Sequence, residues 1–181
     1  IHSLDDRELE FWRENIRAGN LYINRGTTGA IVLRQPFGGM GKSSIGSGMK
    51  AGGPNYIPCF MNFRDTSVVP DPAYEIVHPQ LAEMYHVVAK FLDNTPLPQA
   101  LISYDRAWCE EFSQEHDHLR LRGQDNIRRY LPFQEVCIRV MPADEKYEIQ
   151  ARVAAALLTG AKVLVSVSPD LPHISQTLLA R

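Results

Sequence analysis

The sequence has few cysteines and no long apolar run. Its three cysteines, Cys59, Cys109 and Cys137, are odd in number and far apart, which argues against a disulfide framework and favours a reducing cytoplasm. No stretch approaches the ~20 apolar residues of a membrane-spanning helix. The N-terminus also lacks the charged-then-apolar pattern of a signal peptide. These absences predict a cytoplasmic protein without a membrane span.

An excess of basic charge is also missing. The formal net charge is -2, so no basic field is expected to attract nucleic acid. The chain does have enough apolar content for a core, because 44% of its residues are hydrophobic and 22% are charged. Its 181 residues suffice for one ordinary domain or two small ones.

Metal-binding and nucleophilic patterns are sparse. His116 and His118 flank Asp117 in a polar segment, but a metal site needs three or four converging ligands. The ligand count favours a solvated loop, and no metal site is predicted. Each cysteine is interpreted as a small buried apolar residue, and no serine-hydrolase triad can be assembled.

The first third of the chain begins with an amphipathic pattern. Ser3 as N-cap, with Asp6 three residues later, predicts a helix over residues 4–18. Gly19 is expected to end this helix in a left-handed conformation. Residues 21–23 then predict a short strand, and residues 31–33 form a second apolar run.

Proline marks the expected boundary between two parts. Pro70-Asp71-Pro72 breaks the chain, so residues 1–69 and 70–181 are predicted to be separate domains. A strand is possible over residues 60–69. Pro79 suits the first turn of a helix, and a further helix is predicted from Tyr104 to Ser113.

The last part of the chain has the pattern of a strand, a helix and a second strand. Residues 136–140 alternate as a strand does, residues 144–159 have helical composition, and residues 162–167 are rich in valine. Gly160 is placed to cap the helix. This order predicts a βαβ unit with parallel strands and a right-handed crossover, and hence an α/β fold. A single βαβ unit leaves sheet edges open, so this part is expected to be incomplete.

Glycines are concentrated between Gly38 and Gly53, where a phosphate-binding loop has to be considered. That motif requires glycine where this chain has Pro36, and the dinucleotide pattern requires glycine where it has Ser44. A glycine-rich turn packed against other backbone is therefore favoured.

Four short strings in the first third carry a family resemblance. They are Ala18-Gly19-Asn20-Leu21-Tyr22-Ile23-Asn24-Arg25, then Thr28-Gly29-Ala30 with Gln35-Pro36-Phe37-Gly38-Gly39, and finally Lys50-Ala51-Gly52-Gly53-Pro54. Together they resemble the C-terminal part of an aldehyde dehydrogenase. The version is similar to Δ1-pyrroline-5-carboxylate (L-glutamate γ-semialdehyde) dehydrogenases, which occur alone or as the second half of bifunctional proline utilisation A proteins.

The resemblance implies NAD-dependent oxidation of L-glutamate γ-semialdehyde to L-glutamate in proline catabolism. In the family, a cysteine thiolate attacks the aldehyde, hydride passes to NAD, and a glutamate-activated water releases the acid. Both catalytic residues and most of the NAD site precede the segment that this chain matches. The resemblance thus implies an inactive fragment of a larger enzyme, with no catalytic residue of its own.

What the resemblance assigns to this chain is substrate binding. Backbone N–H groups of Thr28, Gly29 and Ala30 correspond to those that hold the substrate's α-carboxylate, which suits a tight turn that presents donors to an anion. Phe37 corresponds to an aromatic that packs against the aliphatic part of the substrate.

Residues 70–181 more weakly resemble an extra C-terminal region of longer family members, which is Rossmann-like and lacks catalytic residues. This likeness implies a role in assembly or in covering the active site. The expected partners are the rest of the parent polypeptide and further copies in a homo-oligomer. The alternative hypothesis is a non-catalytic interaction or oligomerisation module that kept an aldehyde-dehydrogenase-like segment.

Overall fold

A computed structural model describes residues 1–27, 29–44, 49–64, 73–91 and 95–167. The chain divides into two compact units, and the first consists of residues 1–65 together with residues 116–128. The second unit contains the remainder of the chain. The chain therefore leaves the first unit, returns to it for a short segment, and leaves again. The predicted boundary at Pro70-Asp71-Pro72 lies outside the described residues.

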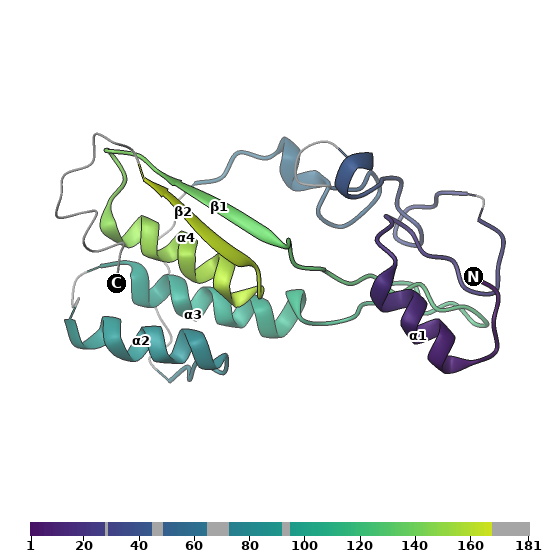
Figure 1. Cartoon of the computed structure of the whole chain (residues 1–181), viewed down its shortest axis with the longest axis horizontal. Coiled ribbons are helices and arrows are strands. Elements are labelled where there is room, and N and C mark those ends of the chain that lie inside the picture. The colour runs from purple at the N-terminus through teal and green to yellow at the C-terminus, as the bar shows by residue number, and fades with distance from the viewer. Residues whose placement is uncertain (28, 45–48, 65–72, 92–94, 168–181) are drawn as a thin grey trace. The chain divides into compact units, whose positions relative to one another are not determined.

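The second unit contains the predicted βαβ arrangement (Figure 1). Strand β1 (Glu135–Val140) pairs in parallel with β2 (Lys162–Val167), and helix α4 (Lys146–Leu158) connects them. Gly160 follows the helix with a φ of 78°, as its predicted capping role requires. The helix starts two residues later than expected because Glu145 is its N-cap and forms a capping box with Glu148. These features confirm the α/β class.

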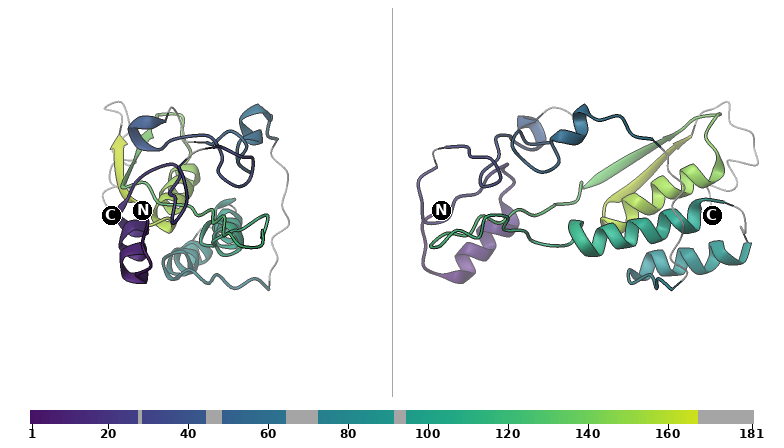
Figure 2. Two further views of the ribbon diagram at one scale, coloured as in Figure 1. Left: turned by 90° about the vertical axis from the view of Figure 1, so that its right-hand side faces the viewer. Right: turned by 180° about the vertical axis from the view of Figure 1, so that it is seen from behind.

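One helix covers one face of this small sheet, and two further helices pack behind it. Helix α4 contacts both strands, and α3 (Leu97–Ala107) and α2 (Pro79–Phe91) pack against α4 and against each other, as the two views of Figure 2 also show. The core between the helices consists of buried aliphatic side chains from all three, namely Leu81, Val88, Leu97, Leu101, Ala154 and Leu158. Burial of each leucine or valine in this set stabilises the unit by roughly 1.5–3 kcal/mol.

Helix α3 starts earlier than the sequence predicted. Pro98 lies in its first turn, where a missing N–H costs no hydrogen bond. The predicted end of this helix, around Ser113, instead corresponds to η3 (Trp108–Phe112), a single turn of π-helix. The predicted start of α3 was wrong because a proline can stand in the first turn of a helix, as Pro98 does here, and does not only end the preceding segment.

A buried carboxylate joins α3 to the start of α2. Asp105 is 0% exposed, and its two oxygens accept hydrogen bonds from the Tyr74 hydroxyl at 2.8 Å, the Val77 N–H at 2.9 Å and the His78 N–H at 2.8 Å. These donors lie just before Pro79, the first residue of α2. Asp105 therefore fixes the chain where it enters that helix.

The described residues of the first unit contain one regular helix, α1 (Asp6–Asn15). It is shorter than predicted, because Asp5 is the N-cap and accepts from the Arg7 N–H at 2.9 Å. Ser3 accepts a hydrogen bond from the Asp5 N–H and donates one to Glu8. Ile16, in extended conformation, ends the helix, so the prediction that Gly19 caps it is wrong.

The rest of the first unit is built from turns. It contains two short 3-10 turns, η1 (Gly41–Ser43) and η2 (Ile57–Phe60). The strand predicted over residues 21–23 does not form. Of the strand considered over residues 60–69, residues 60–64 form none and residues 65–69 lie outside the described residues. Neither segment pairs with a neighbouring strand among the described residues, and a local apolar pattern without such a partner does not make a strand. No helix in the described part of the chain is long and apolar enough to cross a bilayer.

Candidate functional site

A reversal of the chain brings three of the predicted substrate-binding residues, Gly29, Ala30 and Phe37, to the same end of a turn. Ile31 and Gln35 form an antiparallel bridge, with N–H to O distances of 3.1 and 2.9 Å. Leu33 in the middle has a φ of 60°. The predicted apolar run over residues 31–33 is therefore a turn. Because the bridge is antiparallel, the residues before Ile31 and after Gln35 leave it on the same side.

On this side lie Gly29 and Ala30. Gly29 has a φ of 97°, a conformation that strains residues with a side chain, and its carbonyl accepts from the Tyr22 hydroxyl at 3.1 Å. Ala30 is exposed. A turn of this kind leaves backbone N–H groups available to an anion. Thr28, the third residue of the predicted anchor, lies outside the described residues.

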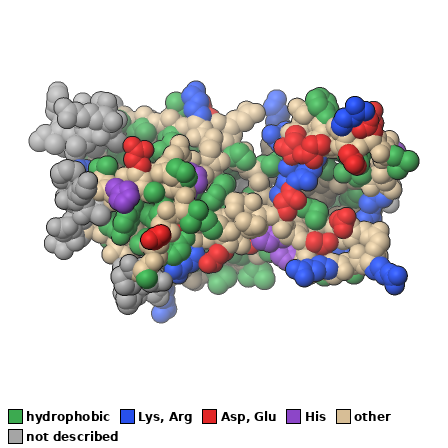
Figure 3. Space-filling model, turned by 90° about the horizontal axis from the view of Figure 1, so that it is seen from below, with side chains coloured by type: hydrophobic (Ala, Val, Ile, Leu, Met, Phe, Trp, Pro, Cys, Tyr) green, Lys and Arg blue, Asp and Glu red, His purple; other side chains and the backbone are tan. Residues whose placement is uncertain are grey.

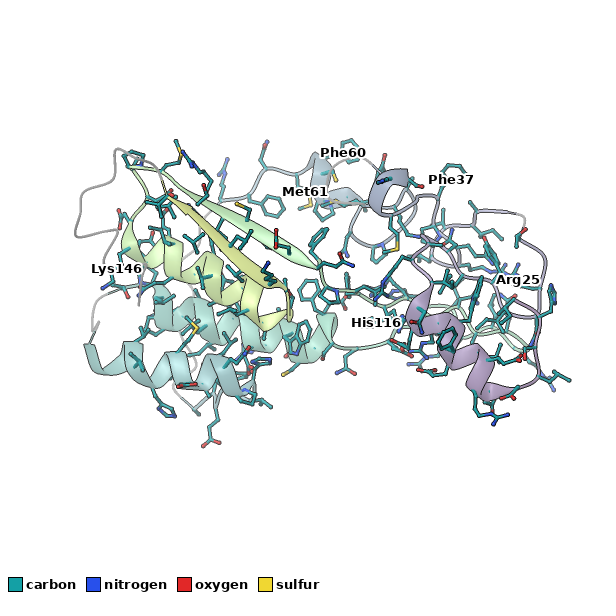
Figure 4. All side chains as sticks on the ribbon, viewed as in Figure 1. Arg25, Phe37, Phe60, Met61, His116 and Lys146 are labelled. Atoms are coloured by element: carbon teal, nitrogen blue, oxygen red, sulfur yellow. The ribbon has the colours of Figure 1, made fainter. Side chains whose placement is uncertain are left out.

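Phe37 follows the same bridge on the other arm. Its backbone forms an antiparallel bridge with Ala51, with both N–H to O distances at 3.0 Å. The side chain is 73% exposed and is labelled in Figure 4. An exposed ring on a backbone fixed by two hydrogen bonds is available for contact with an apolar group. Within residues 1–181 the ring is therefore not part of a core.

The sequence analysis missed Lys50 and Asn20 as members of this site. The Lys50 ammonium donates to the Gly19 carbonyl and, at 3.1 Å, to Asn20 Oδ1. The Asn20 amide in turn donates to the Pro36 carbonyl at 3.2 Å. Burial lowers the pKa of the Lys50 ammonium. Both residues stand within the strings that carry the family resemblance. The strings thus pointed to these positions, but they did not indicate what the two side chains bind.

Gly19 allows these segments to approach one another. A Cβ atom at this position would lie 2.1 Å from the Gly38 carbonyl oxygen and 2.9 Å from the Gly39 Cα. The predicted glycine-rich turn thus packs against backbone from another part of the unit. The requirement for glycine at position 19 comes from this close approach and not from capping a helix.

The cysteines do not form a nucleophilic site in the described residues. Cys59 and Cys137 are exposed and Cys109 is half-buried, and all three are free. The expectation that Cys59 and Cys137 are buried is therefore wrong, because both are exposed, although the Cys59 thiol lies 2.8 Å from Met49 Sδ. Burial, followed by the charges of Asp105 and Glu110, raises the pKa of the Cys109 thiol, whereas a nucleophilic cysteine needs a lowered pKa.

The segment with His116 and His118 is an organised loop. Its ends are joined by the His116–Arg128 bridge, and the Asp117 carboxylate accepts from the N–H groups of Leu119, Arg120 and Asn126 at 3.0–3.2 Å. These backbone donors, led by Arg120, lower the pKa of Asp117. Among the described residues, no cluster of three or more potential ligands could hold a metal ion.

Charged groups of both signs are mixed on the surface. On the face drawn in Figure 3, acidic and basic side chains alternate with hydrophobic ones, and neither sign dominates. An example is the Arg7–Asp5 pair at the start of α1, with 2.6 Å between Nη2 and Oδ2. Exposed pairs of this kind add little stability.

Comparison with known proteins identifies the first third of the chain. Residues 1–66 match the sequence model of the aldehyde dehydrogenase family. Over 59 residues the chain is 52% identical to 1-pyrroline-5-carboxylate dehydrogenase of Bacillus thuringiensis (strain Al Hakam), and equally to that of Bacillus cereus (strain B4264). These stretches cover 33% of this chain and 11% of each relative, so the chain spans about a tenth of the length of the curated relatives it matches.

A solved structure extends the likeness over nearly the whole chain. The structure of proline utilization A from Corynebacterium freiburgense superposes with a TM-score of 0.73 and 36% sequence identity, covering 94% of this chain and 18% of that one. Both units thus have counterparts in a single longer protein. The chain therefore matches a part of such a protein, and its first 66 residues match the sequence model of the aldehyde dehydrogenase family.

Proposed function

We propose that this chain is part of an NAD-dependent dehydrogenase that oxidises L-glutamate γ-semialdehyde, formed from Δ1-pyrroline-5-carboxylate, to L-glutamate in proline catabolism. The observation that carries the proposal is the placement of Gly29, Ala30 and Phe37 on one side of the Ile31–Gln35 bridge, within the segment that matches the aldehyde dehydrogenase family. The likeness to 1-pyrroline-5-carboxylate dehydrogenases supports the choice of substrate.

In this proposal the chain binds the substrate and leaves the chemistry to other residues. Backbone N–H groups of residues 28–30 hold the α-carboxylate, and the Phe37 ring contacts the methylene groups. The catalytic cysteine, the catalytic glutamate and most of the NAD site lie outside residues 1–181. The raised pKa of Cys109 is in keeping with a nucleophile elsewhere.

The direct test is an activity measurement on the gene product that contains these residues. It is expected to form NADH from NAD when Δ1-pyrroline-5-carboxylate, the source of the semialdehyde, is supplied. The 181-residue chain alone is expected to form none. A gene product that oxidises other aldehydes and leaves this substrate untouched would overturn the substrate assignment, and turnover by the isolated chain would overturn the separation of binding from catalysis.

Replacement of Phe37 by alanine tests its contact with substrate. Because the ring is 73% exposed, its loss is expected to change stability by less than about 0.5 kcal/mol. We expect KM for the semialdehyde to rise about tenfold, which corresponds to an apolar contact of about 1.4 kcal/mol. The matched control is Phe60→Ala, since Phe60 is 76% exposed in the same unit. Equal effects of the two substitutions on KM would contradict a specific role for Phe37.

For residues 70–181 we propose a role in assembly of the parent protein as a homo-oligomer. The face of the β1–β2 sheet opposite α4 leaves Leu164 41% exposed and Cys137 exposed, and parallel sheets are usually covered on both faces. Leu164→Glu in the gene product is expected to shift its size-exclusion elution toward the monomer, with activity per folded protomer measured alongside. A monomeric wild type would contradict the proposal. So would an oligomeric wild type whose elution volume Leu164→Glu leaves unchanged.

A further inference from the structure

Lys50 lies where two separate segments of the first unit meet. Its ammonium donates to the Gly19 carbonyl and to the Asn20 side chain at 3.1 Å. Its own carbonyl accepts from the Gly53 N–H at 2.9 Å. The lysine therefore joins the segment after α1 to the turn that begins at its own position.

Asn20 continues this connection to the aromatic arm. Its Oδ1 accepts from Lys50, and its Nδ2 donates to the Pro36 carbonyl at 3.2 Å. Pro36 directly precedes Phe37, whose backbone is paired with Ala51 at 3.0 Å in both directions. Asn20 and Lys50 thus hold Phe37 from its N-terminal side, while Ala51 holds it from across the bridge.

The electrostatics indicate that this ammonium does more than fill space. Lys50 is half-buried, and its two hydrogen-bond acceptors are amide oxygens. Removing a charged group from water is costly unless its hydrogen bonds are replaced, and hydrogen bonds from charged donors are about twice as strong as neutral ones. The Lys50 contacts therefore define the positions of Gly19 and Asn20 more strictly than an apolar contact would.

We propose that Lys50 and Asn20 are positioning residues that set the location of the Phe37 ring against the substrate's aliphatic chain. This inference rests on the proposed function, because it concerns how that site is held in register. Neither residue touches the reacting atoms, so their loss acts on substrate affinity through Phe37. A displacement of a positioned group by about 1 Å can cost up to about a hundredfold in rate.

The test compares three variants of the gene product by steady-state kinetics. Lys50→Met keeps the length of the side chain and removes the ammonium, and Asn20→Asp keeps the acceptor for Lys50 but removes the donor to Pro36. Lys42→Met is the matched control, since Lys42 is exposed in the same glycine-rich segment. We expect KM for the semialdehyde to rise about tenfold in the first two variants, while kcat and KM for NAD stay within about twofold of wild type. Lys42→Met should leave all three constants unchanged.

A purely structural role would change the amount of active protein and hence apparent kcat, with KM unaffected. If the wild type oxidises the semialdehyde, that result overturns the inference. An unchanged KM in both Lys50→Met and Asn20→Asp overturns it as well. Absence of that activity in the wild type would instead overturn the proposed function. If Lys50→Met does not fold, Asn20→Asp decides, because it preserves the ammonium and its acceptor.

Hydrogen exchange provides a readout that does not depend on activity. In Lys50→Met and Asn20→Asp, the amides of Phe37 and Ala51 are expected to exchange at least about tenfold faster, because the bridge between them loses its support. The amides of α3 and α4, in the other unit, should exchange at the wild-type rate. Unchanged protection at Phe37 and Ala51 in both variants would contradict the proposed positioning role.

Discussion

Replacement of Gly19 by alanine is expected to destabilise the first unit by about 3 kcal/mol, the upper end of what overpacking costs. The new Cβ would lie 2.1 Å from the Gly38 carbonyl oxygen and 2.9 Å from the Gly39 Cα. Both atoms belong to backbone, so no rotation of a side chain can relieve the clash. Either the segment after α1 or the Gly38-Gly39 turn must move. The first carries the Gly19 carbonyl and the Asn20 side chain, which bind Lys50, and the second directly follows Phe37.

Hydrogen exchange resolved by unit is the suitable measurement, because a protein with two units need not unfold in one step. Amides in the first unit should lose protection in Gly19→Ala, while those of α4 should keep it. Gly26→Ala is the matched control: a Cβ there would have no heavy atom within 4 Å. Wild-type protection in Gly19→Ala would show that the close approach imposes no requirement for glycine.

Replacement of Asp105 by alanine is expected to cost the second unit about 4 kcal/mol. The side chain accepts three hydrogen bonds at 2.8–2.9 Å, and bonds to a charged acceptor contribute about 1.5–3 kcal/mol each, with a further cost for buried donors left unpaired. The chain that enters α2 would lose its attachment to α3. Denaturant unfolding, with exchange at α2 and α3 amides, measures the effect. A loss below about 1 kcal/mol, the worth of one ordinary hydrogen bond, would contradict this account.

Tyr74→Phe is the matched variant, because it removes only one of the three bonds. Burial, then the hydrogen bond to Asp105, raises the pKa of Tyr74 from 10.0 to about 12. The folded protein therefore holds the phenolic proton more tightly than the unfolded chain. This contribution to stability is complete below pH 10 and is lost as the pH rises toward about 12. Tyr74→Phe should lack that part of the alkaline loss, and identical pH profiles for variant and wild type would argue against the Tyr74–Asp105 bond.

The sequence was most informative where local preferences and packing agreed. Residues 136–167 combine alternation in β1, a helical composition in α4 and a glycine at position 160, and the observed elements differ from those predicted by no more than two residues. The buried side chains of α2, α3 and α4 then provide the packing that these local preferences require. The α/β class could be predicted for this reason.

Prediction was weaker in the first unit, where turns and side-chain hydrogen bonds set the structure. Local sequence placed Gly19 at the end of a helix, whereas its role is to admit the Gly38 backbone. The motif strings drew attention to Gly29, Ala30 and Phe37, but the roles of Lys50 and Asn20 depend on contacts across about thirty positions in sequence, between Lys50 and Gly19 or Asn20. No periodicity reports contacts of that kind.

The return of residues 116–128 to the first unit has a consequence for how this protein is made. A ribosome releases the chain from its N-terminus, so residues 1–65 emerge long before the segment that completes their unit. Domains usually fold as they emerge, but this one must wait while helices α2 and α3 are synthesised. The second unit in turn needs β1, α4 and β2, so its contacts cannot all form before residue 167 has been released.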